Sequence, residues 1–140
     1  MILKGGTVLL TMPLSDTLEF AFDELSRFYF ESTGKKLTTT FDKDDESVVF
    51  SLGKTQLLEK SGLEKDYSAL REDGFFITEK EEIVYIDGNT DFAVLYGVYD
   101  FLEVYLGVRF FSADTTVVPK TEKIDKWFAL GMTAIYSLAL

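Results

Sequence analysis

The chain has 140 residues, of which 46% are hydrophobic, and a formal net charge of −10. This size and apolar content predict one packed domain and exclude a disordered chain, and the acidic surface disfavours a nucleic-acid partner, because phosphate binding requires a basic one. Histidine and cysteine are both absent, which excludes disulfides, thiolate nucleophiles, imidazole bases and HExxH zinc sites and leaves carboxylates, lysine and tyrosine for any catalysis.

The first expected elements are a strand and a long amphipathic helix. The apolar run 8–12 lies between a glycine pair and a proline, which predicts a short buried strand. Apolar residues then recur at three- and four-residue spacing over 18–29, the pattern of a helix with one buried face. Asp16, with Glu19 three residues later, predicts a capping box, and Gly34 is placed to end the helix.

Four further strands and a short helix are expected in the middle of the chain. The first two strands flank the acidic stretch DKDDE at 42–46, which predicts a hairpin loop. This stretch fails the EF-hand pattern, because Ser47 and Gly53 occupy the sixth and twelfth positions, where calcium loops need Gly and Glu. The stretch 53–73 predicts a loop with a short helix near Leu57, and Asp87-Gly88 predicts a turn. The expected strands are residues 37–41, 48–52, 74–79 and 82–86.

A second long helix is expected from Asn89 or Thr90 to Leu106, with Gly107 ending it. Its apolar residues surround most of its circumference, which indicates a buried helix and not an exposed row of rings for stacking on sugars. Gly97 inside this helix predicts a close approach to a neighbour, which we expect to be the sheet. The expected apolar stripe is Leu95, Val98, Tyr99, Leu102, Tyr105 and Leu106, extended sideways by Val94, Phe101 and Val104.

The C-terminal part of the chain predicts short extended pieces at 108–111 and 116–118, followed by an uncharged tail. The fourteen residues WFALGMTAIYSLAL after Lys126 are too few to span a bilayer, so no membrane span is expected. We divide the chain into an α+β domain at 1–125 and an apolar tail at 126–140. Three interpretations of the tail stay open: a buried terminal helix, a surface for a partner, or a segment whose natural continuation is missing.

Several motifs resemble, in order and spacing, those of a known family: GFFIT, IDG, LYGVYDFLEVYLGVRFF and VVPK. With the first helix, FAFDELSRFYFESTGKKL, they resemble the N-terminal non-catalytic domain of family 67 alpha-glucuronidases over about residues 7–122, and more distantly that of family 20 beta-hexosaminidases. The resemblance implies a zincin-like α+β fold, a mixed β-sheet with two main helices packed on one side. It also implies a separate catalytic (β/α)₈ barrel, which needs about 250 residues, so no catalytic residue of the family maps onto this chain.

The chain departs from the family pattern at three places. One is the uncharged stretch WFALGMTAIYSLAL after VVPK, where the family continues toward the barrel with polar and proline-containing sequence. Asp91-Phe92-Ala93 enters the second helix where the family has an Arg-Gly element, and no clear signal peptide is present, although the family is often exported.

The sequence therefore predicts a non-catalytic accessory domain of a polysaccharide-degrading glycoside hydrolase, with a catalytic barrel or a polysaccharide as partner and no cofactor or metal. The first alternative is a carbohydrate-binding module that uses aromatic residues outside the predicted core. The second is a partner-binding or homo-oligomeric protein that uses the apolar tail. A free-standing enzyme is least favoured, because Asp100 and Glu103 share one helix face and glycosidase carboxylates face each other across a cleft. The candidate contact residues are Tyr67, Phe110, Phe111 and Trp127, and by strand alternation only one of the two adjacent phenylalanines should point outward.

Overall fold

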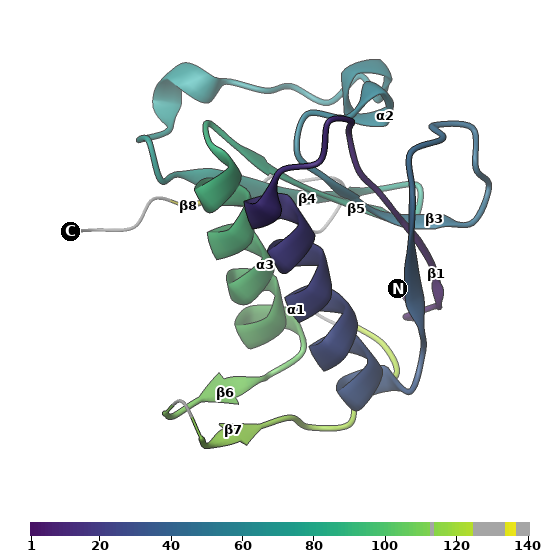
Figure 1. Ribbon diagram of the computed structural model, residues 1–140, viewed down its shortest axis with the longest axis vertical. Coiled ribbons are helices and arrows are strands. Elements are labelled where there is room, and N and C mark those ends of the chain that lie inside the picture. Colours follow the sequence, from purple (N-terminus) through teal and green to yellow (C-terminus); the bar gives the residue numbers. More distant parts are fainter. Residues whose placement is uncertain (113, 125–133, 137–140) are drawn as a thin grey trace.

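The computed structural model describes residues 1–112, 114–124 and 134–136 of the chain. Within them a six-stranded mixed sheet carries two long helices, α1 and α3, side by side on one face, and a small β6–β7 hairpin lies beyond the ends of these helices (Figure 1). This arrangement confirms the expected α+β class with a mixed sheet. The strands are β1 Gly6–Leu9, β2 Leu37–Thr40, β3 Val48–Leu52, β4 Phe75–Lys80, β5 Ile83–Gly88, β6 Arg109–Phe110, β7 Thr116–Val117 and β8 Ala134–Tyr136, and the helices are α1 Asp16–Thr33, α2 Gln56–Lys60, the 3₁₀ turn η1 Tyr67–Ala69 and α3 Asp91–Tyr105.

The strand order of the sheet is β2-β1-β3-β5-β4-β8. The expected hairpin of β2 and β3 is wrong, because β1 lies between these strands and pairs in parallel with both. The acidic stretch between them instead returns the chain to the opposite end of the sheet. Its carboxylates form the turns: Asp42 Oδ1 accepts from Asp44 N at 2.9 Å, and Asp45 Oδ1 accepts from Ser47 N at 2.8 Å. Such turns serve a crossover as well as a hairpin.

The second predicted hairpin is confirmed, since β4 and β5 pair antiparallel from Phe75↔Gly88 to Lys80↔Ile83. The expected turn at Asp87-Gly88 is wrong, because both residues still belong to β5. At its other edge β4 pairs with β8, so residues 134–136 of the predicted tail form a strand of the sheet, and the expectation of a terminal helix is wrong for these residues. In the described part of the chain, no helix combines the length and the apolar character that crossing a membrane requires.

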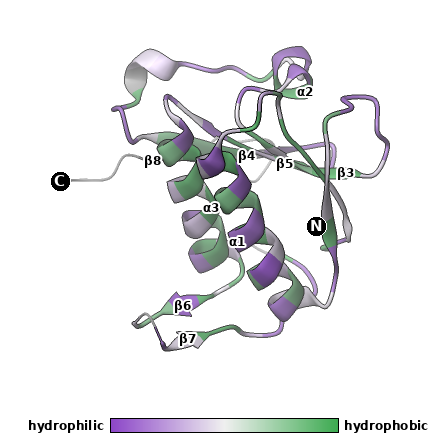
Figure 2. Cartoon of the chain, viewed as in Figure 1, coloured by the Kyte–Doolittle hydropathy of each residue, from purple (hydrophilic) through white to green (hydrophobic). Residues whose placement is uncertain are grey.

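Helix α1 begins one residue earlier than the capping prediction placed it. Ser15, not Asp16, is the N-cap: its backbone is extended and its Oγ accepts from Leu18 N at 3.1 Å. The predicted end is confirmed, because Gly34 adopts a left-handed φ of 74° and donates to Phe30 O at 2.8 Å. This helix carries most of the hydrophilic colouring of the helical layer, whereas α3 is coloured mainly hydrophobic (Figure 2).

Helix α3 packs directly on the sheet, as its central glycine predicted. A Cβ added at Gly97 would lie 2.6 Å from Cγ2 of Ile86 on β5 and 3.2 Å from Cδ2 of Phe75 on β4. The buried face is rotated from the predicted stripe, because Phe101 is fully buried at its centre and Val104 is 55% exposed. Thr90 caps the helix as expected, accepting from Ala93 N at 3.1 Å.

Strand alternation divides the buried residues of the sheet between its two faces. On β4, Phe75 and Ile77 belong to the main core under the two long helices, whereas Phe76 faces the opposite side. A smaller cluster of Leu58, Leu70, Phe76 and Tyr85 lies there, covered by the segment that contains α2 and η1. The expected short helix near Leu57 is thus present, and it closes the second face of the sheet.

Candidate functional site

The carboxyl ends of β1, β3 and β5 meet at one edge of the sheet, because these strands are parallel. In the sheet, the chain goes from β1 to β2 on one side and from β3 to β4 on the other. Open sheets commonly bind ligands at the point where the direction changes in this way. A crevice of about 220 Å³ lies at this edge, lined among others by Met12, Lys54, Asp87 and Asn89.

Asp87, at the end of β5, is 1% exposed and is the centre of a polar network. The Tyr67 hydroxyl donates to its Oδ2, and Lys54 Nζ lies 3.5 Å from its Oδ1. Lys54 also donates to the carbonyl of Gly88 and lies 4.6 Å from the centre of the Tyr67 ring. Burial raises the pKa of Asp87, and the hydrogen bond from Tyr67 and the charge of Lys54 oppose that shift. Burial, together with the nearby Asp87, raises the pKa of Tyr67.

This network holds the covering segment on the sheet. Tyr67 and Lys54 belong to that segment, and Asp87 belongs to β5. The neighbouring Asn89 Nδ2 donates to the carbonyls of Tyr67, Leu70 and Arg71 at 3.1–3.2 Å. Because the carboxylate is engaged by groups of the chain itself, the geometry supports a structural role for the network and not a reactive one.

A second candidate lies between the C-terminal halves of α1 and α3 and the β6–β7 hairpin, where a groove of about 430 Å³ opens. Three rings line it: Phe110 meets Phe28 and Tyr99 edge to face, at centroid distances of 5.2 and 5.5 Å. Glu24 of α1 and Glu103 of α3 also line it. The fold therefore brings together carboxylates from two helices, which inspection of each helix by itself did not predict.

Charges in this groove are partly paired. Burial, together with the carboxylate of Glu24, which accepts a hydrogen bond from the Tyr99 hydroxyl, raises the pKa of Tyr99 to about 12. The guanidinium of Arg27 lies 4.8 Å from the centre of the Phe28 ring, and its Nε is 3.7 Å from Glu31.

Asp100 lies half-buried on α3, one turn before Glu103. Its Oδ2 has no hydrogen-bond partner among the described residues. Burial, with a smaller contribution from the Glu103 charge, raises the pKa of Asp100 to about 6. The two carboxylates share one helix, as predicted, and nowhere in the described ranges do three or more acidic residues gather in a way that could hold a metal ion.

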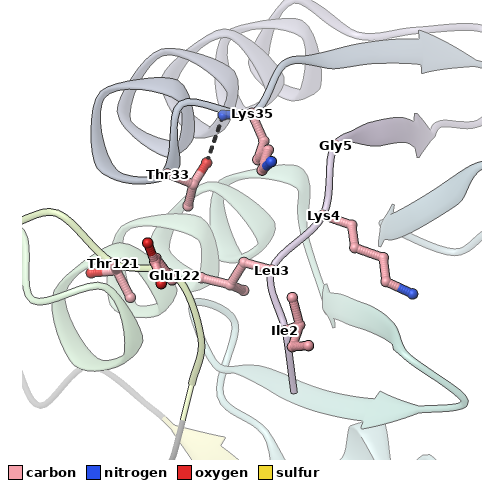
Figure 3. A pocket seen from close by; sticks show the side chains of 8 residues that line it. All are labelled: Ile2, Leu3, Lys4, Gly5, Thr33, Lys35, Thr121 and Glu122. Carbon is pink, nitrogen blue, oxygen red and sulfur yellow. Dashed lines mark hydrogen bonds between the residues drawn. The ribbon is translucent and has the colours of Figure 1, made fainter.

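A third hollow, of about 400 Å³, lies where the N-terminal segment meets residues 121–122 (Figure 3). Lys4 Nζ lies 3.4 Å from Glu82, and the backbone N–H of Lys35 donates to Thr33 Oγ1 at 3.0 Å. Glu122 also lines this hollow. This hollow lies where two segments of the chain meet, and the hydrogen bond from Leu3 N to Glu122 O at 3.0 Å joins these segments.

The four predicted contact residues do not form one site. Phe110 is half-buried in the groove, whereas Phe111 is 68% exposed, which agrees with the expected alternation. Tyr67 lies at the other end of the domain, where Lys54 covers its ring and its hydroxyl is bound to Asp87. Trp127 lies outside the described residues. Ligand contact by any of the four stays a prediction.

The comparison with protein families gives one match: the model for the glycosyl hydrolase family 67 N-terminus matches residues 6–101. No curated protein sequence matches the chain.

Solved structures show the same fold at low sequence identity. A family 115 4-O-methyl-alpha-glucuronidase with specificity for decorated arabinogalactans superposes with a TM-score of 0.67 and 12% identity, over 94% of this chain and 17% of that one. A family 138 enzyme targeting pectin rhamnogalacturonan II gives 0.51 and 21% identity, over 69% of this chain and 13% of that one. A beta-hexosaminidase of Streptomyces plicatus gives 0.49 and 15% identity, over 74% and 18%. The chain thus spans less than a fifth of the length of each of these proteins.

Proposed function

Because the chain belongs to the glycosyl hydrolase family 67 N-terminus family, we propose that it is a non-catalytic accessory domain of an alpha-glucuronidase-like, polysaccharide-degrading glycoside hydrolase. The family match over residues 6–101, which runs from β1 into α3, is the observation that carries the proposal. The zincin-like assignment of the fold belongs to the same proposal. The two structures with TM-scores above 0.5 support the accessory role. This fold forms 17% and 13% of their chains, which leaves room for a larger catalytic domain.

The proposed partner of the domain is a catalytic barrel, and we place the contact at the carboxyl edge of the sheet. Met12, Phe20 and Phe92 are 66%, 47% and 59% exposed. Met12 lines the crevice at this edge, while Phe20 and Phe92 lie in the N-terminal turns of α1 and α3, which begin at the same end of the layer (Figure 1). Exposed apolar residues also lie at the opposite end, Phe111 and Val117 among them. Our placement rests on the three large ones that accompany the crevice at the carboxyl edge, since neighbouring exposed apolar residues are typical of a surface that is covered in the whole protein.

Titration calorimetry tests the proposed contact. The chain is titrated into a family 67 alpha-glucuronidase from which the corresponding N-terminal domain has been removed, and we expect a one-to-one complex. Phe92→Ser should weaken it by about tenfold, because burial of a phenylalanine contributes about 1.5–3 kcal/mol. Phe111→Ser, at the far end of the domain, is the matched control and should bind like the unchanged chain. Failure to bind, or an equal loss in the control, would overturn this placement.

The oligomerisation alternative rests on the apolar tail. Most of residues 126–140 lie outside the described part of the chain, and the stretch 134–136 pairs with β4. The boundary at 125 and a role of the tail in self-association stay predictions. The carbohydrate-binding alternative has a specific observation in its favour, the aromatic groove beside the β6–β7 hairpin.

A further inference from the structure

We infer that the groove between α1, α3 and the β6–β7 hairpin binds a neutral pyranose unit. This inference goes beyond the proposed accessory role and does not depend on it. The groove, of about 430 Å³, is within the range of pockets that hold small ligands. It also lies at the opposite end of the helical layer from Phe92, so the proposed catalytic-domain contact leaves it open.

The first requirement of a pyranose site is an apolar surface for the C–H face of the sugar. Phe110 and Tyr99 line the groove and are only half-buried, so part of each ring remains accessible. Phe28, which is 4% exposed, packs edge to face against Phe110 and fixes its orientation. Rings held in this way offer contact area without loss of side-chain entropy on binding.

The second requirement is a set of acceptors for sugar hydroxyls. The carboxylates of Glu24 and Glu103 line the groove from two different helices. A hydroxyl that donates to a carboxylate forms a charge-assisted hydrogen bond, which is shorter and stronger than a bond between neutral groups. Two acceptors beside a ring surface match a molecule that has hydroxyls around its edge and C–H groups on its faces.

The charges of the groove select a neutral sugar over an anionic one. Among the described residues that line the groove, Arg27 is the cation, and it is engaged by Glu31 and by the Phe28 ring. Arg109 lies beside Glu103 and donates to the carbonyls of Glu103 and Val108. A uronate carboxylate would therefore meet two like charges and two cations that already have other partners, on a chain whose net charge is −10. Replacing that carboxylate by a hydroxymethyl group removes the repulsion and keeps the ring contacts.

A matched pair of ligands tests the inference. Methyl β-D-glucopyranoside and methyl β-D-glucuronide are titrated separately into the ¹⁵N-labelled chain and followed by amide chemical shifts. The neutral sugar should bind with a Kd in the millimolar range, on the order of 1–10 mM, and shift the amides around Glu24, Tyr99 and Phe110. The glucuronide should bind at least about tenfold more weakly.

Variants of the chain distinguish binding in the groove from a nonspecific effect of the added sugar. Glu24→Gln and Glu103→Gln keep the shape of the side chains and should each weaken neutral-sugar binding by about fivefold or more. Phe110→Leu should also weaken binding of the neutral sugar, while the leucine still fills the space beside Phe28. The amide spectrum of this variant shows whether the domain is folded. Phe41→Leu, an exposed ring outside the groove, is the control and should leave the Kd unchanged. Absence of shifts at about 50 mM sugar, far above the expected Kd, shifts located elsewhere, or tighter binding of the glucuronide would overturn the inference.

Discussion

Gly97 offers the sharpest test of how α3 is seated on the sheet. A methyl group at this position would lie 2.6 Å from Cγ2 of Ile86, closer than packed carbon atoms approach each other, and 3.2 Å from Cδ2 of Phe75, a tight contact. Overpacking of this kind costs about 1–3 kcal/mol, whereas alanine in place of a helical glycine returns about 1 kcal/mol. We therefore expect Gly97→Ala to lower the free energy of unfolding by about 1 kcal/mol.

Gly97→Ala should raise the free energy of unfolding, instead of lowering it, once Cγ2 of Ile86 is removed. In an Ile86→Ala background, the added Cβ fills part of the space that Cγ2 leaves, so Gly97→Ala should stabilise the domain by about 1 kcal/mol. Urea unfolding followed by circular dichroism, for the four proteins of this cycle, measures the coupling between the two positions. A stabilising effect of Gly97→Ala in the unchanged chain would refute the reasoning that contact with β5 requires glycine.

Four further substitutions test the electrostatics and the N-cap of α1, all by urea unfolding. Because the pKa of Asp100 rises from 3.8 to about 6 on folding, the folded state holds the proton more tightly, and the free energy of unfolding falls as pH rises through this interval. Asp100→Asn should therefore stabilise the domain above pH 7 by about 1 kcal/mol, allowing for solvent screening of a half-exposed group, and have little effect near pH 3. Tyr67→Phe removes a donor from the buried Asp87 and should cost about 1–3 kcal/mol at neutral pH. Ser15→Ala should cost about 1 kcal/mol and Asp16→Ala less, because Ser15 is the N-cap, and equal costs would contradict that assignment.

Elements defined by local patterns could be predicted from the sequence. Both long helices, the β4–β5 hairpin and the close approach at Gly97 follow from spacing and glycine placement within a single segment. The strand order could not be predicted, because β1 pairs with both β2 and β3 across long stretches of chain. The acidic stretch between β2 and β3 has turn-forming residues that suit a hairpin and a crossover equally well.

The candidate sites could not be predicted either, because their residues come from distant segments of the chain. Each wall of the groove lies on a different segment, so Glu24 and Glu103 became a pair only through the packing of α1 against α3. The Asp-Gly pair at 87–88 predicts a turn, whereas both residues belong to β5. The position of Asp87, directly after the apolar strand 83–86, is the feature of the sequence that indicates its environment. A carboxylate that continues a buried strand needs hydrogen-bond partners from another segment.

Whether the chain itself breaks glycosidic bonds is the most direct test of the proposed accessory role. The purified chain, Glu24→Gln and Glu103→Gln are incubated separately with 4-nitrophenyl glycosides, including the α-glucuronide and the N-acetyl-β-glucosaminide, and nitrophenol release is followed. The two variants matter because these carboxylates line one groove from two different helices, and glycosidases use two carboxylates. We predict no release above the buffer rate from any of the three proteins. Turnover by the unchanged chain that is lost in either variant would contradict the account.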